Sequence, residues 1–306
     1  MSKRTNLILQ SLLFVSLFII FLEGVKFFQT PFFDASCPKV HYPLSNDRID
    51  VVIPCIEKDL KTLDRCIEGI LKYGENINRV VVVSSKRLTD KAEWFDDSRY
   101  PFDKEAVALA LCKGDEKKAK EYLFKARSRV GWYYQQLLKL YAPFVIPAIS
   151  SNVLILDADT IFINPVQFQT ESLESNFNPG REWHKPYYTH MKRMIPWLHR
   201  IYPRYSGIAH HMLFQKPVLE DLFDEISRYH EGEVWKIFCN LVDEDHLNYS
   251  GASEYELYFN FALSRCNLMK IRPLKWRNID TLSSLDALQS QGVHYVSCHS
   301  YMRKEE

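Results

Sequence analysis

Short runs of consecutive apolar residues alternate along the chain with longer segments whose apolar residues recur every three or four positions. The runs at 49–54, 79–85 and 153–156 predict strands that are buried on both faces. The segment 60–73 has the spacing of an amphipathic helix, with Gly74 as its stop. A strand, a helix and a second strand in this order predict a parallel β-α-β unit with a right-handed crossover, so the fold class is α/β.

Later segments continue this alternation of helices and strands. The segment 131–142 predicts a mostly apolar helix that leads to the strand at 153–156, whereas 94–127 is polar and predicts a loop and a helix. The segment 206–214 predicts a strand that begins with a glycine and returns to the sheet, and 217–229 predicts an amphipathic helix.

The N-terminus carries an apolar run from Leu7 to Leu22, preceded by Lys3 and Arg4. No small-residue cleavage site follows, so we predict an uncleaved signal anchor with a cytoplasmic N-terminus. The expected organisation is a cytoplasmic tip and anchor helix over 1–28, a short stem over 29–46 and one large domain over 47–306. A eukaryotic source would place that domain in the lumen of the Golgi or the endoplasmic reticulum, and a bacterial source at the inner membrane.

Bulk composition narrows the function classes only slightly. The chain has 306 residues, 46% of them hydrophobic, and a formal net charge of +1, so nucleic acid is not an expected partner. It has seven cysteines and no Cys-x-x-Cys pair, which argues against a zinc site. The odd number argues against a fully oxidised framework and leaves one or two disulfides open.

The strand at 153–156 ends in two carboxylates, Asp157 and Asp159. Because side chains alternate along a strand, the two acids are expected on the same side. Like charges repel unless a positive group lies between them, and ligands bind at the carboxyl ends of strands in α/β sheets. A divalent cation that holds a diphosphate is the simplest group to satisfy this arrangement.

The run from 153 to 165, with its Asp-x-Asp and its later Asn164-Pro165, resembles the metal-binding motif of glycosyltransferases with the GT-A fold, glycogenin-like enzymes in particular. The resemblance implies that 47–306 is a GT-A catalytic domain behind a transmembrane anchor. It also implies a hexosyltransferase-like activity that moves a sugar from a nucleoside-diphosphate sugar to a hydroxyl of a glycan, lipid or protein.

The same resemblance implies roles for individual residues. Asp157, Asp159 and the late His299 would hold Mn²⁺ (or Mg²⁺), and an imidazole among the ligands favours manganese. Lys139, on the helix before the motif, matches a basic residue that reaches the donor, although a solvated helix face explains it equally well. The full set expected on the donor side is Pro54, Glu57, Asp59, Ser84, Gln135, Lys139, Ala158 and Lys304.

A helix is expected to begin near Ser253, with Glu254 and Glu256 in its first turn. Ser253 with Glu256 has the spacing of a capping box, which gives Glu256 a structural explanation. Glu254 is then the better candidate for a general base that takes the proton of the acceptor hydroxyl, as the resemblance implies at this helix start. Both acids remain candidate catalytic residues.

The stretch 181–211 is rich in basic and aromatic residues and has a single acid. Rings stack on sugar faces and cations pair with phosphates or carboxylates, so we interpret it as a groove for an anionic glycan or lipid acceptor. Trp183, His210 and His211 are the candidate contacts, although adjacent strand residues face opposite ways. A surface near anionic lipid headgroups is the alternative. Binding of single-stranded nucleic acid would use the same residue types, but the nearly neutral net charge of the chain does not support it.

Two other functions use the same features. A phosphohydrolase of the haloacid dehalogenase type also places Asp-x-Asp after an apolar strand, and 243–245 is the nearest match to its second acidic motif. A membrane-anchored module that binds a sugar without transferring it would need the same pocket and no catalytic group. Phosphatase activity, or binding without turnover, would distinguish these alternatives.

Overall fold

The computed structural model describes residues 14–18, 39–265 and 269–304. Within these residues, no helix combines the length and the apolar character needed to cross a membrane. Most of the apolar run 7–22, and with it the predicted anchor, lies outside the described residues, so the prediction of an anchor is not tested.

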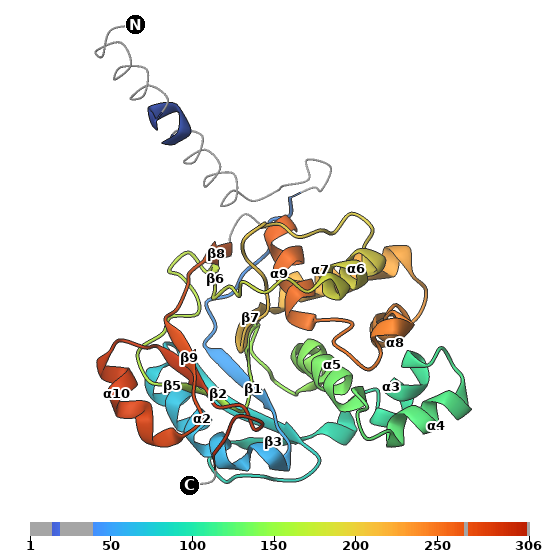
Figure 1. Ribbon diagram of the computed structural model, residues 1–306, viewed down its shortest axis with the longest axis horizontal. Helices are drawn as coiled ribbons and strands as arrows, with labels where there is room; N and C mark the ends of the chain where they lie inside the picture. Colours follow the sequence, from blue (N-terminus) through green and yellow to red (C-terminus); the bar gives the residue numbers. More distant parts are fainter. Residues whose placement is uncertain (1–13, 19–38, 266–268, 305–306) are drawn as a thin grey trace, which may run out of the picture.

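A five-stranded sheet in the order β3-β2-β1-β4-β7 forms the centre of the fold (Figure 1). Its strands are β1 (Ile49–Pro54), β2 (Ile77–Ser84), β3 (Glu93–Asp96), β4 (Asn152–Leu156) and β7 (His211–Gln215). All neighbouring strands pair in parallel except β4 and β7, which are antiparallel. This mixed, mainly parallel sheet fits the predicted GT-A fold.

Helices cover both faces of this sheet. They are α2 (Leu60–Tyr73), α3 (Lys104–Leu111), α4 (Glu116–Phe124), α5 (Val130–Val145), α6 (Lys185–Met194), α7 (Lys216–Tyr229), α8 (Val234–Asn240), α9 (Glu254–Arg265) and α10 (Leu285–Ser290). Side-chain alternation assigns the faces: Val51 and Ile53 pack into the core that contains α2, whereas Val52 packs into the larger core that contains α5 and α9. Both faces of the strands are therefore apolar, as the continuous apolar runs predict.

Two small sheets flank the central one. The first joins β5 (Thr160–Phe162), β10 (Tyr295–Ser297) and β9 (Trp276–Asn278), and the second joins β6 (Ser175–Phe177) and β8 (Met269–Ile271). Single 3₁₀ turns occur at Glu57–Asp59, Asp97–Arg99, Glu244–His246 and Leu282–Ser284. Because β10 pairs antiparallel with β5, the end of the chain returns beside the segment that follows β4.

Several predicted elements are confirmed and others are wrong in detail. The parallel β1-α2-β2 unit and the strand before Asp157 are present, and α2 has the predicted bounds. The polar segment 94–127 contains an edge strand and two helices instead of one helix. The strand expected at 206–214 begins only at His211, because residues before it form the loop that crosses the start of α9.

The predicted stem is partly packed on the domain. Tyr42 is buried and its hydroxyl donates to Asp221 Oδ2 at 2.6 Å, while Val40 N–H donates to Arg265 O at 2.8 Å. Lys39 contacts the same end of α9. Residues of the predicted stem from Lys39 onward therefore contact the domain. The five cysteines among the described residues are free and buried; Cys37 and Cys266 lie outside them.

Candidate functional site

Asp157 leaves β4 on the side of the sheet that faces α5 and α9. Val153 and Ile155 point into that core, and Asp157 continues their alternation. Its Oδ1 lies 2.7 Å from the Lys139 amine of α5, and the same amine lies 2.9 Å from Glu254 Oε1 at the start of α9. Three distant segments thus meet in one buried acid–base–acid cluster.

Lys139 lies inside the protein, with only 6% of its side chain exposed, and it does not face a solvated surface. Burial acts to lower the pKa of Lys139, but the charges of Asp157 and Glu254 outweigh it and hold the pKa well above its ordinary value. The ammonium also lies 4.3 Å from the centre of the Tyr255 ring. Lys139 therefore stays charged and fixes the positions of two carboxylates.

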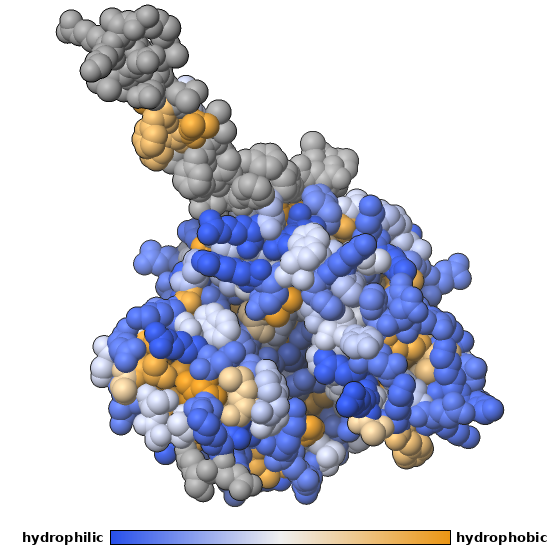
Figure 2. Space-filling view, in the orientation of Figure 1, coloured by the Kyte–Doolittle hydropathy of each residue, from blue (hydrophilic) through white to orange (hydrophobic). Residues whose placement is uncertain are grey.

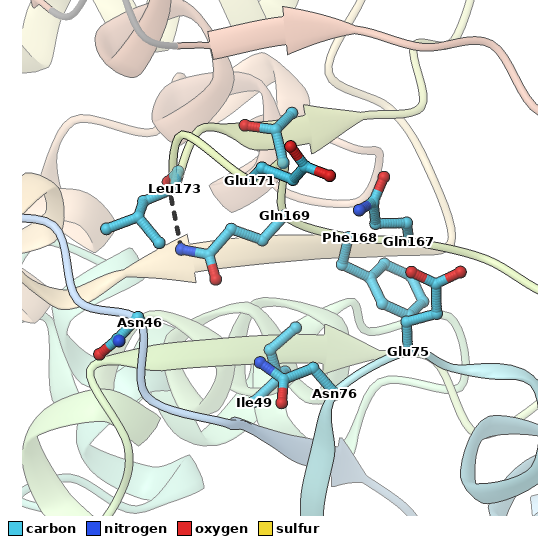
Figure 3. A pocket seen from close by; sticks show the side chains of 10 residues that line it. Asn46, Ile49, Glu75, Asn76, Gln167, Phe168, Gln169, Glu171 and Leu173 are labelled. Carbon is cyan, nitrogen blue, oxygen red and sulfur yellow. Dashed lines mark hydrogen bonds between the residues drawn. The ribbon is translucent and has the colours of Figure 1, made fainter.

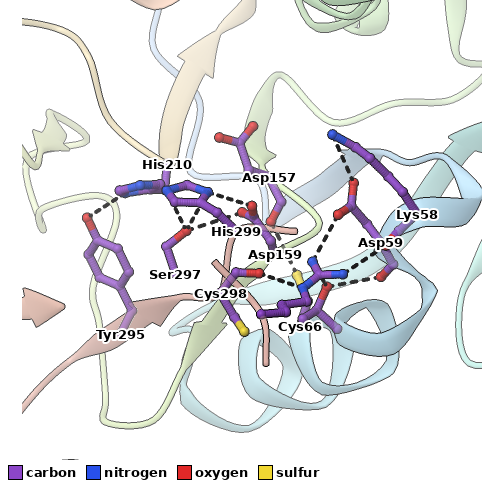
Figure 4. Close-up of polar contacts among 12 residues, drawn as sticks. Lys58, Asp59, Cys66, Asp157, Asp159, His210, Tyr295, Ser297, Cys298 and His299 are labelled. Atoms are coloured by element: carbon purple, nitrogen blue, oxygen red, sulfur yellow. Dashed lines mark hydrogen bonds and ion pairs between the residues drawn. The ribbon is translucent and has the colours of Figure 1, made fainter. Parts of the chain in front are cut away.

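Asp159 pairs with His299, which β10 brings to it. Asp159 Oδ2 and His299 Nδ1 are 2.8 Å apart, Ser297 Oγ donates to Asp159 Oδ1 at 3.3 Å, and Cys298 N–H donates to Asp159 O at 2.9 Å (Figure 4). The hydrogen bond to Asp159 raises the pKa of His299. Burial acts to raise the pKa of Asp159, but the hydrogen bond and charge of His299 outweigh burial, so the pKa of Asp159 is lowered.

His210 and His211 are not separated by strand alternation, because β7 begins only at His211 and both rings pack against Tyr295, with ring centres 5.7 and 5.1 Å away. His210 lies beside the site: its backbone oxygen accepts from Asp157 N–H at 3.0 Å, and its ring centre is 5.5 Å from that of His299. His211 is 2% exposed and packs against aromatic rings that include Phe162. Burial lowers the pKa of His211 to about 3, so this residue is a neutral core side chain that an acceptor does not reach.

Ser253 caps α9, but Glu256 does not complete a capping box. Ser253 Oγ accepts from Glu256 N–H at 3.2 Å. The Glu256 carboxylate turns away and accepts from Gly207 N–H at 2.6 Å and from Asn260 Nδ2 at 3.0 Å. Gly207 is required there, because a Cβ would lie 2.6 Å from Tyr255 O. Glu256, fully buried, holds the loop before β7, and Glu254 is the acid beside Asp157.

Arg303 fastens the end of the chain to the β1–α2 turn. Its guanidinium donates to Cys298 O and Lys58 O, both at 2.8 Å, and to Asp59 Oδ1 at 2.9 Å. The predicted donor contact Lys304 is instead exposed and pairs with Asp280 at 2.5 Å. The segment that carries His299 is therefore tied to the turn after β1 by an arginine whose donors are used within the protein.

A pocket of about 290 Å³ opens at the carboxyl ends of β1 and β2, against α5. It is lined by Pro54, Cys55, Ile56, Lys58, Asp59, Val83, Asp97, Lys104, Arg129, Gly131, Trp132, Tyr134, Gln135 and Leu138. Three of the predicted donor residues, Pro54, Asp59 and Gln135, line it. Parallel strands end here and leave space between their connections, which is where α/β sheets bind ligands.

The other predicted donor residues lie outside this pocket. Glu57 is exposed and pairs with Lys86. Ser84 is buried and its hydroxyl donates to Lys86 O at 2.8 Å, so it supports the turn after β2. Ala158 is 4% exposed and packs in the core on the α2 side, because it alternates with Asp157.

The basic and aromatic stretch lies over α6 and its flanks. Trp183 is 65% exposed, with the Arg200 guanidinium 4.7 Å from its ring centre. The Tyr187 ring stacks on that of Trp132, which lines the pocket, with ring centres 6.3 Å apart. Figure 2 shows this face of the molecule hollowed near its middle, between the part that carries α6 and α9 and the part that carries β9. The stretch thus borders the site and is not remote from it.

Gln136, which was not among the expected site residues, lies one turn before Lys139 on the same face of α5. Its Oε1 accepts from Glu254 N–H at 3.0 Å, and its Nε2 is buried without a partner among the described residues. Two polar residues spaced by three on an apolar helix were the available signal. Arg303 was not among the expected donor residues, because no local pattern shows that it bonds to a turn formed by residues 58 and 59.

Residues 48–298 match a family of unknown function, DUF6492. The chain belongs to this family. No curated protein matches it. Solved structures that resemble it include mouse xyloside xylosyltransferase 1 in its apo form, with a TM-score of 0.40, 11% identity, and 84% of this chain and 99% of that chain covered.

Two further glycosyltransferases resemble the chain at the same level. The apo WbbM bifunctional glycosyltransferase gives a TM-score of 0.39 at 12% identity, covering 85% of this chain and 47% of that one. The mannosyltransferase Ktr4p from S. cerevisiae gives a TM-score of 0.41 at 11% identity, covering 79% of this chain and 73% of that one. Similarity this low carries no argument about activity, so the function of this family member has to be argued from its own site.

The donor set at this site suits a divalent cation, but its placement suits one only in part. Asp159 and His299 supply a carboxylate and an imidazole, with Asp157 two residues away, and these are manganese ligands by type. Across 14–18, 39–265 and 269–304, however, no three His, Cys, Asp or Glu side chains are gathered as a metal site. Asp159 and His299 bond to each other, and Asp157 points away from Asp159 (Figure 4), so the two acids do not share one side as expected. Asp157 pairs instead with Lys139.

Proposed function

We propose that this protein is a metal-dependent glycosyltransferase that moves a sugar from a nucleoside-diphosphate sugar to an acceptor hydroxyl. One observation carries the proposal: the Asp159–His299 pair and the buried Asp157–Lys139–Glu254 cluster converge at the carboxyl end of β4, beside a pocket at the ends of β1 and β2. Binding of a diphosphate needs positive charge at such a strand end, and Asp157, Asp159 and His299 are side chains of the types that bind a divalent cation.

In the proposed arrangement the nucleotide occupies the pocket lined by Pro54, Asp59 and Gln135. Asp159 and His299, with Asp157, would hold Mn²⁺ or Mg²⁺ beside this pocket. The bound cation supplies positive charge to the departing diphosphate. Lys139 is a positioning residue, since its amine holds Asp157 and Glu254 at fixed places.

The bond between the sugar and the diphosphate oxygen breaks and a bond to the acceptor oxygen forms. Glu254 is the proposed proton acceptor: Oε1 pairs with Lys139, and Oε2 would take the proton of the acceptor hydroxyl. Glu254→Gln should abolish transfer and leave donor binding intact. Near-normal turnover in that variant would remove Glu254 from the reaction.

The deciding experiment is a calorimetric titration of the full chain with UDP, then GDP and CDP, in Mn²⁺ and in EDTA. We expect nucleotide binding to require the metal, and we expect Asp159→Ala to weaken the affinity by at least tenfold. A matched control is Asp224→Ala, which changes an exposed carboxylate on α7. The absence of binding to all three nucleotides would overturn the proposal, and binding without turnover on any donor would favour the sugar-binding module.

The second acidic motif that a phosphohydrolase would need is not formed by residues 243–245 in this fold. Residues 243–245 follow helix α8 and not a strand. Asp243 pairs with Arg193 and Glu244 pairs with Lys118, both at the surface. These acids therefore do not join Asp157 in a shared site.

A further inference from the structure

The helix α6 presents one polar face from which acidic residues are absent. Lys185, Thr189, Lys192 and Arg193 recur at helical spacing on that face, while His190, Met191 and Met194 are buried on the other. Together with Tyr188, this polar face borders an open hollow of about 390 Å³. We call Lys185, Thr189, Lys192 and Arg193 the cationic face of α6.

Charge on this face is largely uncompensated. Arg193 pairs with Asp243 at 2.8 Å, but Lys185 and Lys192 are exposed and neither contacts an acid within the described part of the chain. The helix itself contains no Asp or Glu. Helix α4 offers a contrast, because its exposed lysines alternate with Glu116 and Glu121 on the same helix. The potential over α6 is therefore positive and not locally neutralised.

The cationic face begins at the proposed transfer site and leads away from it. Just before α6, His184 Nε2 lies 2.6 Å from Ser250 O, and Tyr187 stacks on Trp132 of the pocket. Lys185 and Lys192 are seven residues apart, which places them roughly 10 Å apart along the helix. Trp183, 65% exposed, offers a ring face at the same end. Rings and spaced cations in one line suit sugars that carry charge.

We propose that the cationic face of α6 binds an anionic glycan, a saccharide chain bearing carboxylate or phosphate groups, as the acceptor. This inference rests on the proposed transferase function and specifies its acceptor. The glycan lies along the helix with its negative groups on Lys185 and Lys192, a sugar ring on Trp183, and its end directed to the site beside Tyr187. Thr189, between the two lysines, donates to Lys185 O and stays on the same surface.

The test measures binding of fluorescent oligogalacturonate to the full chain in neutral detergent. The comparison probes are a neutral maltooligosaccharide of the same length, phosphatidylserine vesicles and a single-stranded oligonucleotide of matched charge. The variant is Lys185→Gln with Lys192→Gln. Its matched control is Lys117→Gln with Lys120→Gln on α4, two exposed lysines of the same type.

We expect the α6 variant to lose about tenfold in affinity for oligogalacturonate, the control to lose less than twofold, and the neutral probe to bind far more weakly. Equal losses in both variants, or tighter binding of vesicles or oligonucleotide than of oligogalacturonate, would overturn the proposal. Nucleotide binding is measured separately on the same samples. If UDP binds and the glycan does not, the acceptor inference fails alone; if the glycan binds and no nucleotide does, the transferase proposal fails.

Discussion

The two ends of the central sheet each have a hollow, and they differ in how polar groups are satisfied. At the amino end, the lining of a pocket of about 200 Å³ includes four amides, Gln169 among them, and the carboxylates of Glu75 and Glu171 (Figure 3). Gln169 Nε2 donates to Ser45 O and Leu173 O, both at 3.1 Å. The buried carboxylate there, Asp50, accepts from Arg79 Nε at 3.0 Å and is structural.

At the carboxyl end, ionisable groups from different elements satisfy one another instead. Lys139, Asp157 and Glu254 come from α5, the end of β4 and α9, and Asp159 with His299 forms a second pair. Amide–backbone bonds hold a fold together without leaving charge to use, whereas paired ions can exchange a partner for a ligand. The difference indicates which end of the sheet is built for binding.

The largest expected change in stability comes from Lys139→Met at the carboxyl end. Removing the ammonium leaves the buried Glu254 carboxylate and the partly buried Asp157 carboxylate without their partner, which should cost about 3–5 kcal/mol in the free energy of unfolding. Urea denaturation measures the loss. Adding Asp157→Asn and Glu254→Gln should restore part of it; a single variant as stable as the wild type would show that the cluster is not coupled.

Glu256 should make stability depend on pH, an effect that the amides of the other end cannot produce. Burial raises the pKa of Glu256 from 4.5 to about 7 in the folded protein. The protonated form therefore stabilises the fold fully below the unfolded pKa, and this contribution disappears as pH rises through 7, a change of roughly 3 kcal/mol. Denaturation between pH 4 and 8 should show this slope in the wild type and a flatter one in Glu256→Gln. Parallel slopes would contradict the assignment.

Gln169→Leu tests the amino end. The change removes one donor from each of the carbonyls of Ser45 and Leu173, which keep Asn152 Nδ2 and Gln215 Nε2 as donors. The loss of these two hydrogen bonds should cost about 1–3 kcal/mol in stability. Affinity for UDP with Mn²⁺ should stay within twofold of the wild type, since this hollow is not the proposed nucleotide site. A loss of nucleotide affinity without a loss of stability would reverse the contrast between the two ends.

The smallest expected effect concerns Arg303. Arg303→Gln releases the segment that carries His299 from Asp59, and should weaken UDP and Mn²⁺ binding by about tenfold, close to 1.4 kcal/mol. Hydrogen exchange should rise together in 298–304 and in 56–62. The neighbouring change Lys304→Gln, at an exposed ion pair, is the control. Equal effects of the two variants would show that Arg303 does not join these segments.

Local patterns predicted much of the first half of the domain and the motif after β4. Consecutive apolar residues identified β1, β2 and β4, and helical spacing gave α2 its bounds. The short edge strand β3 was missed because it has only one buried residue, Phe95. Glu256 was misjudged because its partner, Gly207, is distant in sequence, and a capping box explained the same spacing.

The sequence by itself determined which groups stand at the end of β4, because the apolar strand is followed directly by Asp157 and Asp159. Only the tertiary structure decided their partners. The pairing of β10 with β5 brings His299 to Asp159, and the packing of α5 and α9 on one face of the sheet encloses Lys139 between Asp157 and Glu254. The physical reason is that alternation and periodicity act between neighbours in sequence, whereas a buried charge is stabilised by groups that only packing brings within hydrogen-bonding distance.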